Sequence, residues 1–138
     1  GVDLVVGADK KFDVLNYINL NNKKNNKVHS CEINSVDFFK NSFSMGERTR
    51  SFLKVQDGCD YKCTYCTIPL ARGKSRSGQI LKLVENAKYL VSNGIKEIVL
   101  TGVNIGDFGI FDVNSGVKES NFLELIKHFN KINLFLKF

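Results

Sequence analysis

The chain has 138 residues, of which 43% are hydrophobic, and it carries a net charge of +6. This length and composition are ordinary for one folded domain, and they exclude a disordered or fibrous chain. No run approaches the roughly 20 apolar residues of a membrane span, and the first residues lack the pattern of a secretory signal. We therefore expect a cytoplasmic protein with no membrane partner. The charge suits an anionic partner such as RNA, but lysine and asparagine are abundant throughout, so charge alone favours nucleic acid only slightly.

The first predicted elements are a strand and a helix. Residues 2–7, VDLVVG, form a short apolar run. Phe12, Leu15 and Ile18 then recur at helical spacing and define one face of a helix. Because the chain starts with Gly1 rather than Met and stops in an apolar run, we expect an internal fragment of a longer protein.

A polar segment follows this first strand and helix. Residues 21–47 show no sustained periodicity, which predicts an irregular connection between two domains. We therefore expect three parts, with the bounds 1–20, 21–47 and 48–138. Aromatic side chains in the connector could stack on a base, but we expect them to anchor the connector on a neighbouring domain; they are Phe38, Phe39 and Phe43.

Strand and helix patterns alternate in the rest of the chain. Residues 51–56, SFLKVQ, predict a strand, and a loop with three cysteines follows it. The next segment predicts a helix, with Ser77 as its N-cap and Gly94 as its stop. The apolar face of this helix consists of Ile80, Val84, Ala87 and Val91.

A second strand, a second helix and a third strand complete the pattern. Residues 96–102 predict a buried strand and residues 132–138 the last one. Between them, Asn121 and Glu124 have the spacing of a capping box. The apolar face of that helix consists of Phe122, Ile126 and Phe129. The order strand, helix, strand, helix, strand predicts an α/β fold with a parallel sheet, in which sites lie at the carboxyl ends of the strands.

The three cysteines of the loop are spaced as C-x3-C-x2-C. Cys59, Cys63 and Cys66 can bind a soft metal as thiolates. Structural zinc takes four closed ligands, and the fourth would have to be Cys31 or His29 in the polar connector. Ferredoxin-type clusters also use four cysteines, at other spacings. Neither pattern fits the loop.

A four-iron cluster held by three cysteines leaves one iron without a protein ligand. That iron can take a substrate or a cofactor, so the vacancy is where we expect the chemistry to occur. A disulfide and a structural zinc site remain the alternatives, although a chain without a secretory signal rarely forms disulfides. Cys31 is expected to be a bystander thiol.

The cysteine loop resembles the signature of the radical S-adenosylmethionine (SAM) enzymes, in which an aromatic residue, here Tyr65, precedes the last cysteine. Residues 48–78 and 97–109 are similar to the tRNA methylthiotransferases. The stretches KVQDGCD (54–60) and PLARG (69–73) most resemble the branch that acts on threonylcarbamoyladenosine next to the anticodon.

This resemblance implies a fold, cofactors and a reaction. The fold would be α/β, the start of a radical SAM partial (β/α)6 barrel, preceded in residues 1–20 by the end of the family's N-terminal methylthiotransferase domain. Cys59, Cys63 and Cys66 would hold a 4Fe-4S cluster whose open iron binds SAM, and a second, auxiliary 4Fe-4S cluster would lie on cysteines outside this chain. The reaction would be methylthiolation at C2 of N6-threonylcarbamoyladenosine 37 in tRNA. Related enzymes act on isopentenyladenosine in tRNA or on a ribosomal-protein aspartate.

The resemblance also implies cofactor contacts. Tyr65 would lie beside the adenine of SAM, although it could simply pack the loop. The segment after the second predicted strand would contact SAM through Thr101, Gly102, Val103 and Asn104, but it lacks the acidic residue common in the superfamily and could be an ordinary strand exit. Basic residues after the cysteines would meet the SAM carboxylate or tRNA phosphates, or would lie in a solvated loop: Arg72, Lys74 and Arg76.

The partners implied are tRNA and a reducing electron donor of the flavodoxin or ferredoxin type, with the protein a monomer. We expect no methylthiolation by these 138 residues alone. Outside the family, the alternatives are a zinc or nucleic-acid-binding module and an iron–sulfur electron-transfer protein.

Overall fold

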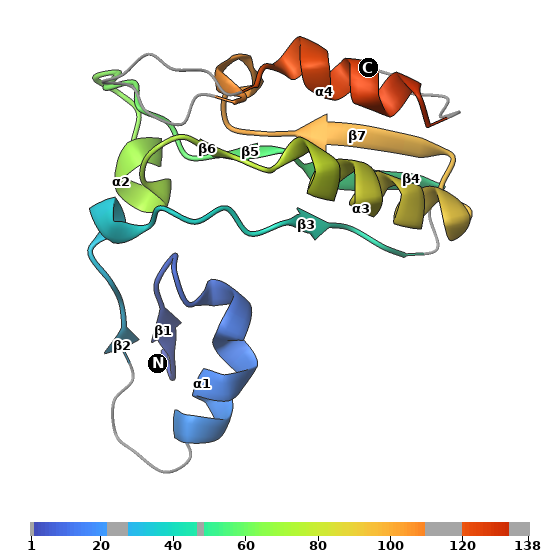
Figure 1. Cartoon of the computed structure of the whole chain (residues 1–138). Helices are drawn as coiled ribbons and strands as arrows, with labels where there is room; N and C mark the ends of the chain where they lie inside the picture. Colours follow the sequence, from blue (N-terminus) through green and yellow to red (C-terminus); the bar gives the residue numbers. More distant parts are fainter. Residues whose placement is uncertain (1, 22–27, 47–48, 110–119, 133–138) are drawn as a thin grey trace.

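The computed structural model of the chain describes residues 2–21, 28–46, 49–109 and 120–132 (Figure 1). Its main sheet has three strands in the order β3 (Ser42–Phe43), β4 (Arg50–Lys54) and β7 (Glu97–Thr101). β4 and β7 are parallel, in a register that pairs Arg50 with Glu97 and Lys54 with Thr101. The predicted parallel pairing of these two strands is therefore confirmed.

The third strand of this sheet, β3, was not predicted. It lies within the polar segment that the sequence indicates as an irregular connector, and it pairs antiparallel with β4, with Phe43 opposite Leu53. Phe43 and Phe39 pack against the hydrophobic core, which agrees with the predicted anchoring, whereas the Phe38 side chain is exposed. The polar segment thus contributes directly to the sheet through two residues.

Two helices cover one face of the sheet. α3 (Ile80–Ser92) and α4 (Phe122–Asn130) contact each other and lie over β4 and β7 in Figure 1. Burial alternates along β4, because Leu53 is fully buried beneath the helices and Phe52, which points to the opposite face, is exposed. One core cluster results, and it consists of Leu53, Val55, Leu83, Ala87, Leu90, Ile95, Ile98, Phe108, Leu125 and Phe129.

The start of α3 differs from the prediction. Ser77 is not its N-cap, because it lies in β6 (Arg76–Ser77), which pairs antiparallel with β5 (Gln56–Asp57). The Ser77 hydroxyl accepts a hydrogen bond from the Gly109 amide instead, and Gln79 occupies the N-cap position. The predicted stop is confirmed: Gly94 follows the helix with a φ of +86°, a conformation that glycine adopts without strain.

The capping box of α4 is confirmed. The Asn121 side chain accepts from the Glu124 amide, and the Glu124 carboxylate accepts from the Asn121 amide. The predicted face is buried at Phe129, and Leu125, which was not predicted, is also fully buried. Of the predicted strand 132–138, residues 133–138 lie outside the described residues.

The N-terminal segment forms a small unit of its own. β1 (Val5–Val6) pairs in parallel with β2 (Val28–His29), and the helical turn η1 (Lys11–Asp13) leads into α1 (Val14–Asn21). The predicted strand and helix are therefore present. Among the described residues, the predicted apolar face of the helix is exposed to solvent, at Phe12, Leu15 and Ile18.

Three short helical elements complete the described chain: η2 (Ile33–Ser35), α2 (Ile68–Arg72) and η3 (Ile105–Asp107). α2 and the segment after β7 lie together at the end of the sheet to which the β7 arrow points in Figure 1. Among the described helices, none has the length and apolar character needed to cross a membrane.

Candidate functional site

The cysteine loop runs from β5 to α2, past the carboxyl end of β4. The amide of Cys59 donates to the Gly73 carbonyl at 3.1 Å, and the amide of Cys66 donates to the Cys63 carbonyl at 3.1 Å. Cys63 is exposed, and Cys59 and Cys66 are half-buried. In the described part of the chain, no three His, Cys, Asp or Glu side chains are arranged to hold a metal ion, so the thiols are not gathered at one point.

The donor chemistry of the loop nevertheless fits an iron–sulfur cluster. All four cysteines of the chain, Cys31 included, lie among the described residues and are free thiols, so none is consumed in a disulfide. Thiolates are the soft ligands that such clusters use. His29, the other proposed fourth zinc ligand, instead packs its ring against Tyr17, with the ring centroids 4.6 Å apart.

Glycines fix both ends of the cysteine loop. Gly58 has a φ of +72°, and a Cβ atom there would overlap with the Lys74 carbonyl oxygen. Gly73 has a φ of +77°, and a Cβ atom there would lie 2.9 Å from the Ile33 carbonyl oxygen. Since a side chain at either position would be strained, the backbone around the first thiol depends on both glycines.

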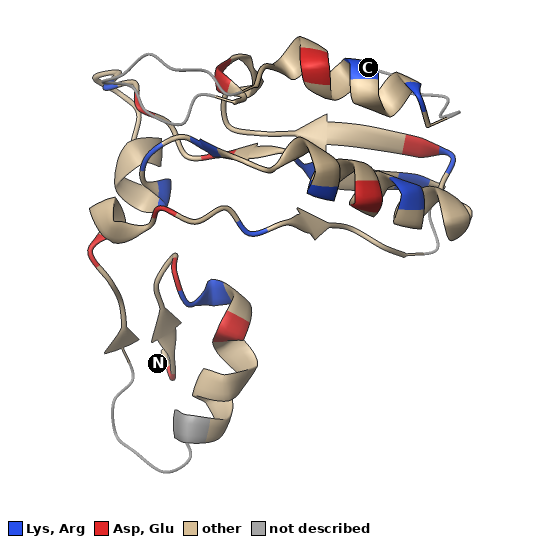
Figure 2. Cartoon of the chain, viewed as in Figure 1, with Lys and Arg blue, Asp and Glu red and all other residues tan. Residues whose placement is uncertain are grey.

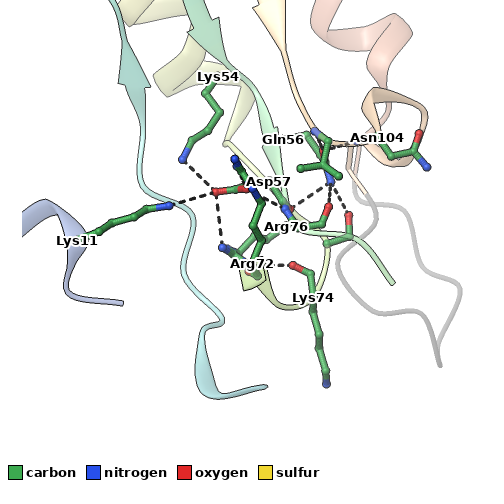
Figure 3. A network of polar contacts seen from close by, with 11 residues as sticks. Lys11, Lys54, Gln56, Asp57, Arg72, Lys74, Arg76 and Asn104 are labelled. Carbon is green, nitrogen blue, oxygen red and sulfur yellow. Dashed lines mark hydrogen bonds and ion pairs between the residues drawn. The ribbon is translucent and has the colours of Figure 1, made fainter. Parts of the chain in front are cut away.

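Immediately before the loop, a buried aspartate gathers four cations (Figure 3). Asp57 is 2% exposed, and its carboxylate lies 3.0 Å from Arg72 Nη1 and 3.3 Å from Lys54 Nζ. Arg76 Nη2 follows at 3.6 Å and Lys11 Nζ at 3.9 Å. Lys11 belongs to η1, so this one carboxylate connects the N-terminal unit to β5, α2 and β6.

These cations determine the ionisation of Asp57. Burial by itself raises the pKa of the carboxyl, but the hydrogen bond from Arg72 and the charges of Lys54 and Arg76 outweigh it, so the pKa lies below its ordinary value. Burial also lowers the pKa of Lys54, although the attraction of Asp57 partly opposes this effect. The Asp57 carboxyl is therefore ionised at neutral pH, and the four basic side chains lie around this negative charge.

Acid should remove the contribution of Asp57 to stability. Because its pKa is depressed in the folded state, this contribution is present above the unfolded pKa of about 4 and is lost as the pH falls through the folded value. We expect the free energy of unfolding, measured by urea denaturation between neutral pH and pH about 2, to fall below about pH 4. Asp57→Asn should flatten this dependence. An equally steep acid dependence in the variant would contradict the assignment.

A cavity of about 520 Å³ lies on the sheet face that the helices leave open. The predicted cofactor residues Thr101 and Gly102 line it together with Val103. Lys54 and Arg72 also line it, so the cavity has two cationic side chains that share the Asp57 carboxylate. The sequence predicted the segment after β7 as part of the site but did not predict Lys54.

The other predicted cofactor residues lie elsewhere. Tyr65 is 89% exposed and is not among the residues that line the cavity. Asn104 donates from Nδ2 to Asp107 Oδ2 at 2.8 Å. Arg76 is turned into the fold, where its Nη1 donates to the carbonyls of Arg72 and Lys74 at 2.8 Å each.

A tyrosine of the cysteine loop contacts the segment after β7. The Tyr61 hydroxyl donates to Asp107 Oδ1 at 3.2 Å, and the negative charge of Asp107 raises the pKa of Tyr61. Asp107 is 8% exposed and also accepts from Asn104. This link between two distant segments has no local signal in the sequence.

The remaining charges are mixed along the covering helices. Figure 2 shows basic and acidic positions alternating on α3 and α4, so the positive charge of the chain is not concentrated there. His128, on α4, contacts the Glu124 carbonyl oxygen through Nδ1 at 2.8 Å. Neither observation places a functional group on these helices.

The described residues thus combine a mixed α/β fold, a three-thiol loop that follows a parallel strand, and a cavity with two cationic side chains. The model of the Radical SAM superfamily matches residues 53–134, which is more than half of the chain. The chain belongs to the radical SAM superfamily.

The curated proteins that this chain resembles include several methylthiotransferases. The threonylcarbamoyladenosine tRNA methylthiotransferase MtaB of Thermotoga maritima is 44% identical over 119 residues, 86% of this chain and 27% of the relative. MtaB of Bacillus subtilis is 35% identical over 129 residues, 91% of this chain and 28% of the relative. The ribosomal protein uS12 methylthiotransferase RimO of Clostridium novyi is 28% identical over 137 residues, 95% of this chain and 29% of the relative. The chain thus spans less than a third of the length of these relatives.

Proposed function

We propose that the protein is a radical SAM tRNA methylthiotransferase that adds a methylthio group at C2 of N6-threonylcarbamoyladenosine 37 in tRNA. The observation that carries the proposal is the loop of three free thiols, Cys59, Cys63 and Cys66, at the carboxyl end of a parallel strand. The similarity to the relatives named as threonylcarbamoyladenosine tRNA methylthiotransferases supports the substrate.

The three thiols would hold a 4Fe-4S cluster. When bound, the cluster and SAM supply the one-electron chemistry that a C2–H bond of adenine requires, because such a bond offers no acidic proton to a general base. The proposed role of the chain's own side chains is to bind and orient. Thr101 and Gly102 line the cavity in which SAM would lie, and Arg72 and Lys54 give that cavity a positive charge that suits a carboxylate.

The wider assignments follow from the same proposal. The sheet would be the start of a partial (β/α)6 barrel, with residues 1–20 as the end of an N-terminal methylthiotransferase domain, 21–47 as a connector and 48–138 as the first part of the radical SAM domain. An auxiliary cluster would be held by cysteines outside these residues. The protein would work in the cytoplasm as a monomer, with tRNA and a flavodoxin- or ferredoxin-like reductant as partners.

A second candidate function is methylthiolation of an aspartate in ribosomal protein uS12. The similarity to RimO, which extends over 95% of this chain, favours it. Methylthiolation of isopentenyladenosine in tRNA is a further alternative within the family.

Mass spectrometry of a deletion strain separates these substrates. We expect loss of the reading frame that contains this chain to abolish 2-methylthio-N6-threonylcarbamoyladenosine in digested tRNA. Expression of the complete reading frame should restore it, and expression of the form with Cys59→Ala, Cys63→Ala and Cys66→Ala should not. The matched control, Cys31→Ala, should restore the nucleoside fully. Unchanged tRNA together with loss of the methylthio group from uS12 would contradict the tRNA assignment.

A further inference from the structure

The side chain of Gln56 is buried, at 1% exposure, between two segments that are far apart in the sequence (Figure 3). Its Nε2 donates to the Gly58 carbonyl at 2.8 Å and to the Asp57 carbonyl at 3.1 Å, directly before the first thiol of the cysteine loop. Its Oε1 accepts from the amides of Val103 at 2.8 Å and Asn104 at 2.9 Å, directly after β7. One amide group therefore joins the start of the cysteine loop to the segment that lines the cavity.

Every polar group of this side chain is used. Besides the two backbone carbonyls, Ser75 Oγ lies 2.9 Å from Nε2, so the two N–H groups of the carboxamide serve three acceptors and one N–H is shared between two of them. The two acceptor lone pairs of Oε1 are taken by the amides of Val103 and Asn104. A buried side chain with all of its hydrogen bonds formed is held in one orientation, because each alternative leaves a buried group without a partner. Gln56 thus fixes the spacing of the segments that it joins.

Gly102 lies directly against the side chain of Gln56. A Cβ atom on Gly102 would lie 2.9 Å from Oε1 and 3.1 Å from Cβ of Gln56. The absence of a side chain on this glycine leaves room for the close approach of Gln56. A larger residue at position 102 would displace the amide from Val103 and Asn104.

A second link joins the same two segments. Tyr61, within the cysteine loop, donates to Asp107, and Asp107 also accepts from Asn104. Tyr61 is exposed and its hydrogen bond is 3.2 Å long, whereas Gln56 forms shorter bonds in the interior. Gln56 is therefore the dominant connection of the two.

We infer that Gln56 is a positioning residue that holds the cysteine loop in register with the segment at residues 101–104, of which Thr101, Gly102 and Val103 line the cavity. This inference rests on the proposed function, since it assigns the thiols to a cluster and the cavity to SAM. Gln56 itself forms part of the cavity lining beside Gly102 and Val103. Loss of its amide should weaken SAM binding, because the lining would shift relative to the thiols, while the thiols themselves remain able to bind iron.

The first test needs no cofactor. Hydrogen exchange of the 138-residue chain, resolved at single amides, should show protected amides at Val103 and Asn104. Gln56→Met keeps the length of the side chain but removes both kinds of hydrogen bond, and it should raise the exchange rates of these two amides by about tenfold or more. The matched control is Gln79→Met, the same change at an exposed glutamine, which should leave both rates unchanged. Unchanged rates in Gln56→Met would overturn the inference.

The second test uses the complete, anaerobically reconstituted protein. Gln56→Met should retain the iron content of the parent and bind SAM about tenfold or more weakly, a change equivalent to about 1.4 kcal/mol, as measured by titration of the cluster's EPR signal. Gln56→Glu covers the case in which the Met variant unfolds, because it keeps an acceptor for Val103 and Asn104 but loses the donor to Gly58. It should retain their amide protection and still bind SAM more weakly.

Failure of the positioning role of Gln56 and failure of the proposed function give different results. SAM binding as tight as in the parent in both variants, or loss of iron together with SAM, would overturn the positioning role. A parent protein that holds no iron would overturn the proposed function, and the amide exchange of the metal-free chain would still decide whether Gln56 joins the two segments.

Discussion

Replacement of Asp57 with alanine is expected to lower the free energy of unfolding by about 3–5 kcal/mol, because it leaves buried cations without their counterion. Lys54 and Arg76 suffer most, since their side chains are only 18% and 10% exposed and both face the carboxylate. The Gly58 amide also loses its acceptor, Asp57 Oδ1 at 3.0 Å. Urea denaturation at neutral pH measures the loss.

Two further variants make this test specific. Asp37→Ala removes an exposed carboxylate and should change stability by no more than about 0.5 kcal/mol. Adding Lys54→Met to Asp57→Ala removes one unpaired cation together with the anion and should recover part of the loss. A loss of stability below about 1 kcal/mol in Asp57→Ala, or no recovery in the double variant, would show that the Asp57 carboxylate does not stabilise the basic side chains around it.

Gly58→Ala should be the most damaging single change in the cysteine loop. The new methyl group would overlap with the Lys74 carbonyl oxygen and lie 2.7 Å from that of Gly73, and the φ of +72° would be strained in addition. We expect a loss of about 2–4 kcal/mol. Thermal or urea unfolding of the chain gives the value.

Two other glycines separate the overlap from the backbone strain. Gly94 has a φ of +86° and no atom within 4 Å of the position that an alanine methyl group would take, so Gly94→Ala should cost about 1 kcal/mol. Gly46 has neither constraint, and Gly46→Ala should be nearly neutral. If Gly58→Ala cost no more than Gly94→Ala, the close approach of Lys74 would be refuted.

Local patterns predicted the regular part of the fold. The strand pattern of residues 51–56 and the capping box at Asn121 are features of neighbouring residues, and both are present in the structure, the strand as β4 (Arg50–Lys54). β3 could not be predicted in this way, because two residues carry no periodicity and the strand exists only through its pairing with β4. The prediction of Ser77 as an N-cap was wrong for the same reason. A serine before a helix resembles an N-cap, but Ser77 pairs with Gln56 of β5 and therefore lies in a strand.

The candidate site was predictable only where it depends on residue type. The spacing of Cys59, Cys63 and Cys66 indicated a three-thiol loop directly from the sequence. Gln56 and Asp57 were missed, because their importance comes from burial and from partners on other elements. The one available signal was two polar residues at the end of an apolar strand, immediately before the loop.

The most direct test of the three-thiol cluster is anaerobic reconstitution of the complete protein with iron and sulfide, followed by iron analysis and EPR spectroscopy of the reduced sample with and without SAM. The comparison uses two proteins that are otherwise identical in sequence: the parent and the form with Cys59→Ala, Cys63→Ala and Cys66→Ala. We predict that the parent holds about four more irons than the variant and that only its EPR signal changes when SAM is added. Equal iron in the two proteins, or a parent signal indifferent to SAM, would contradict the assignment.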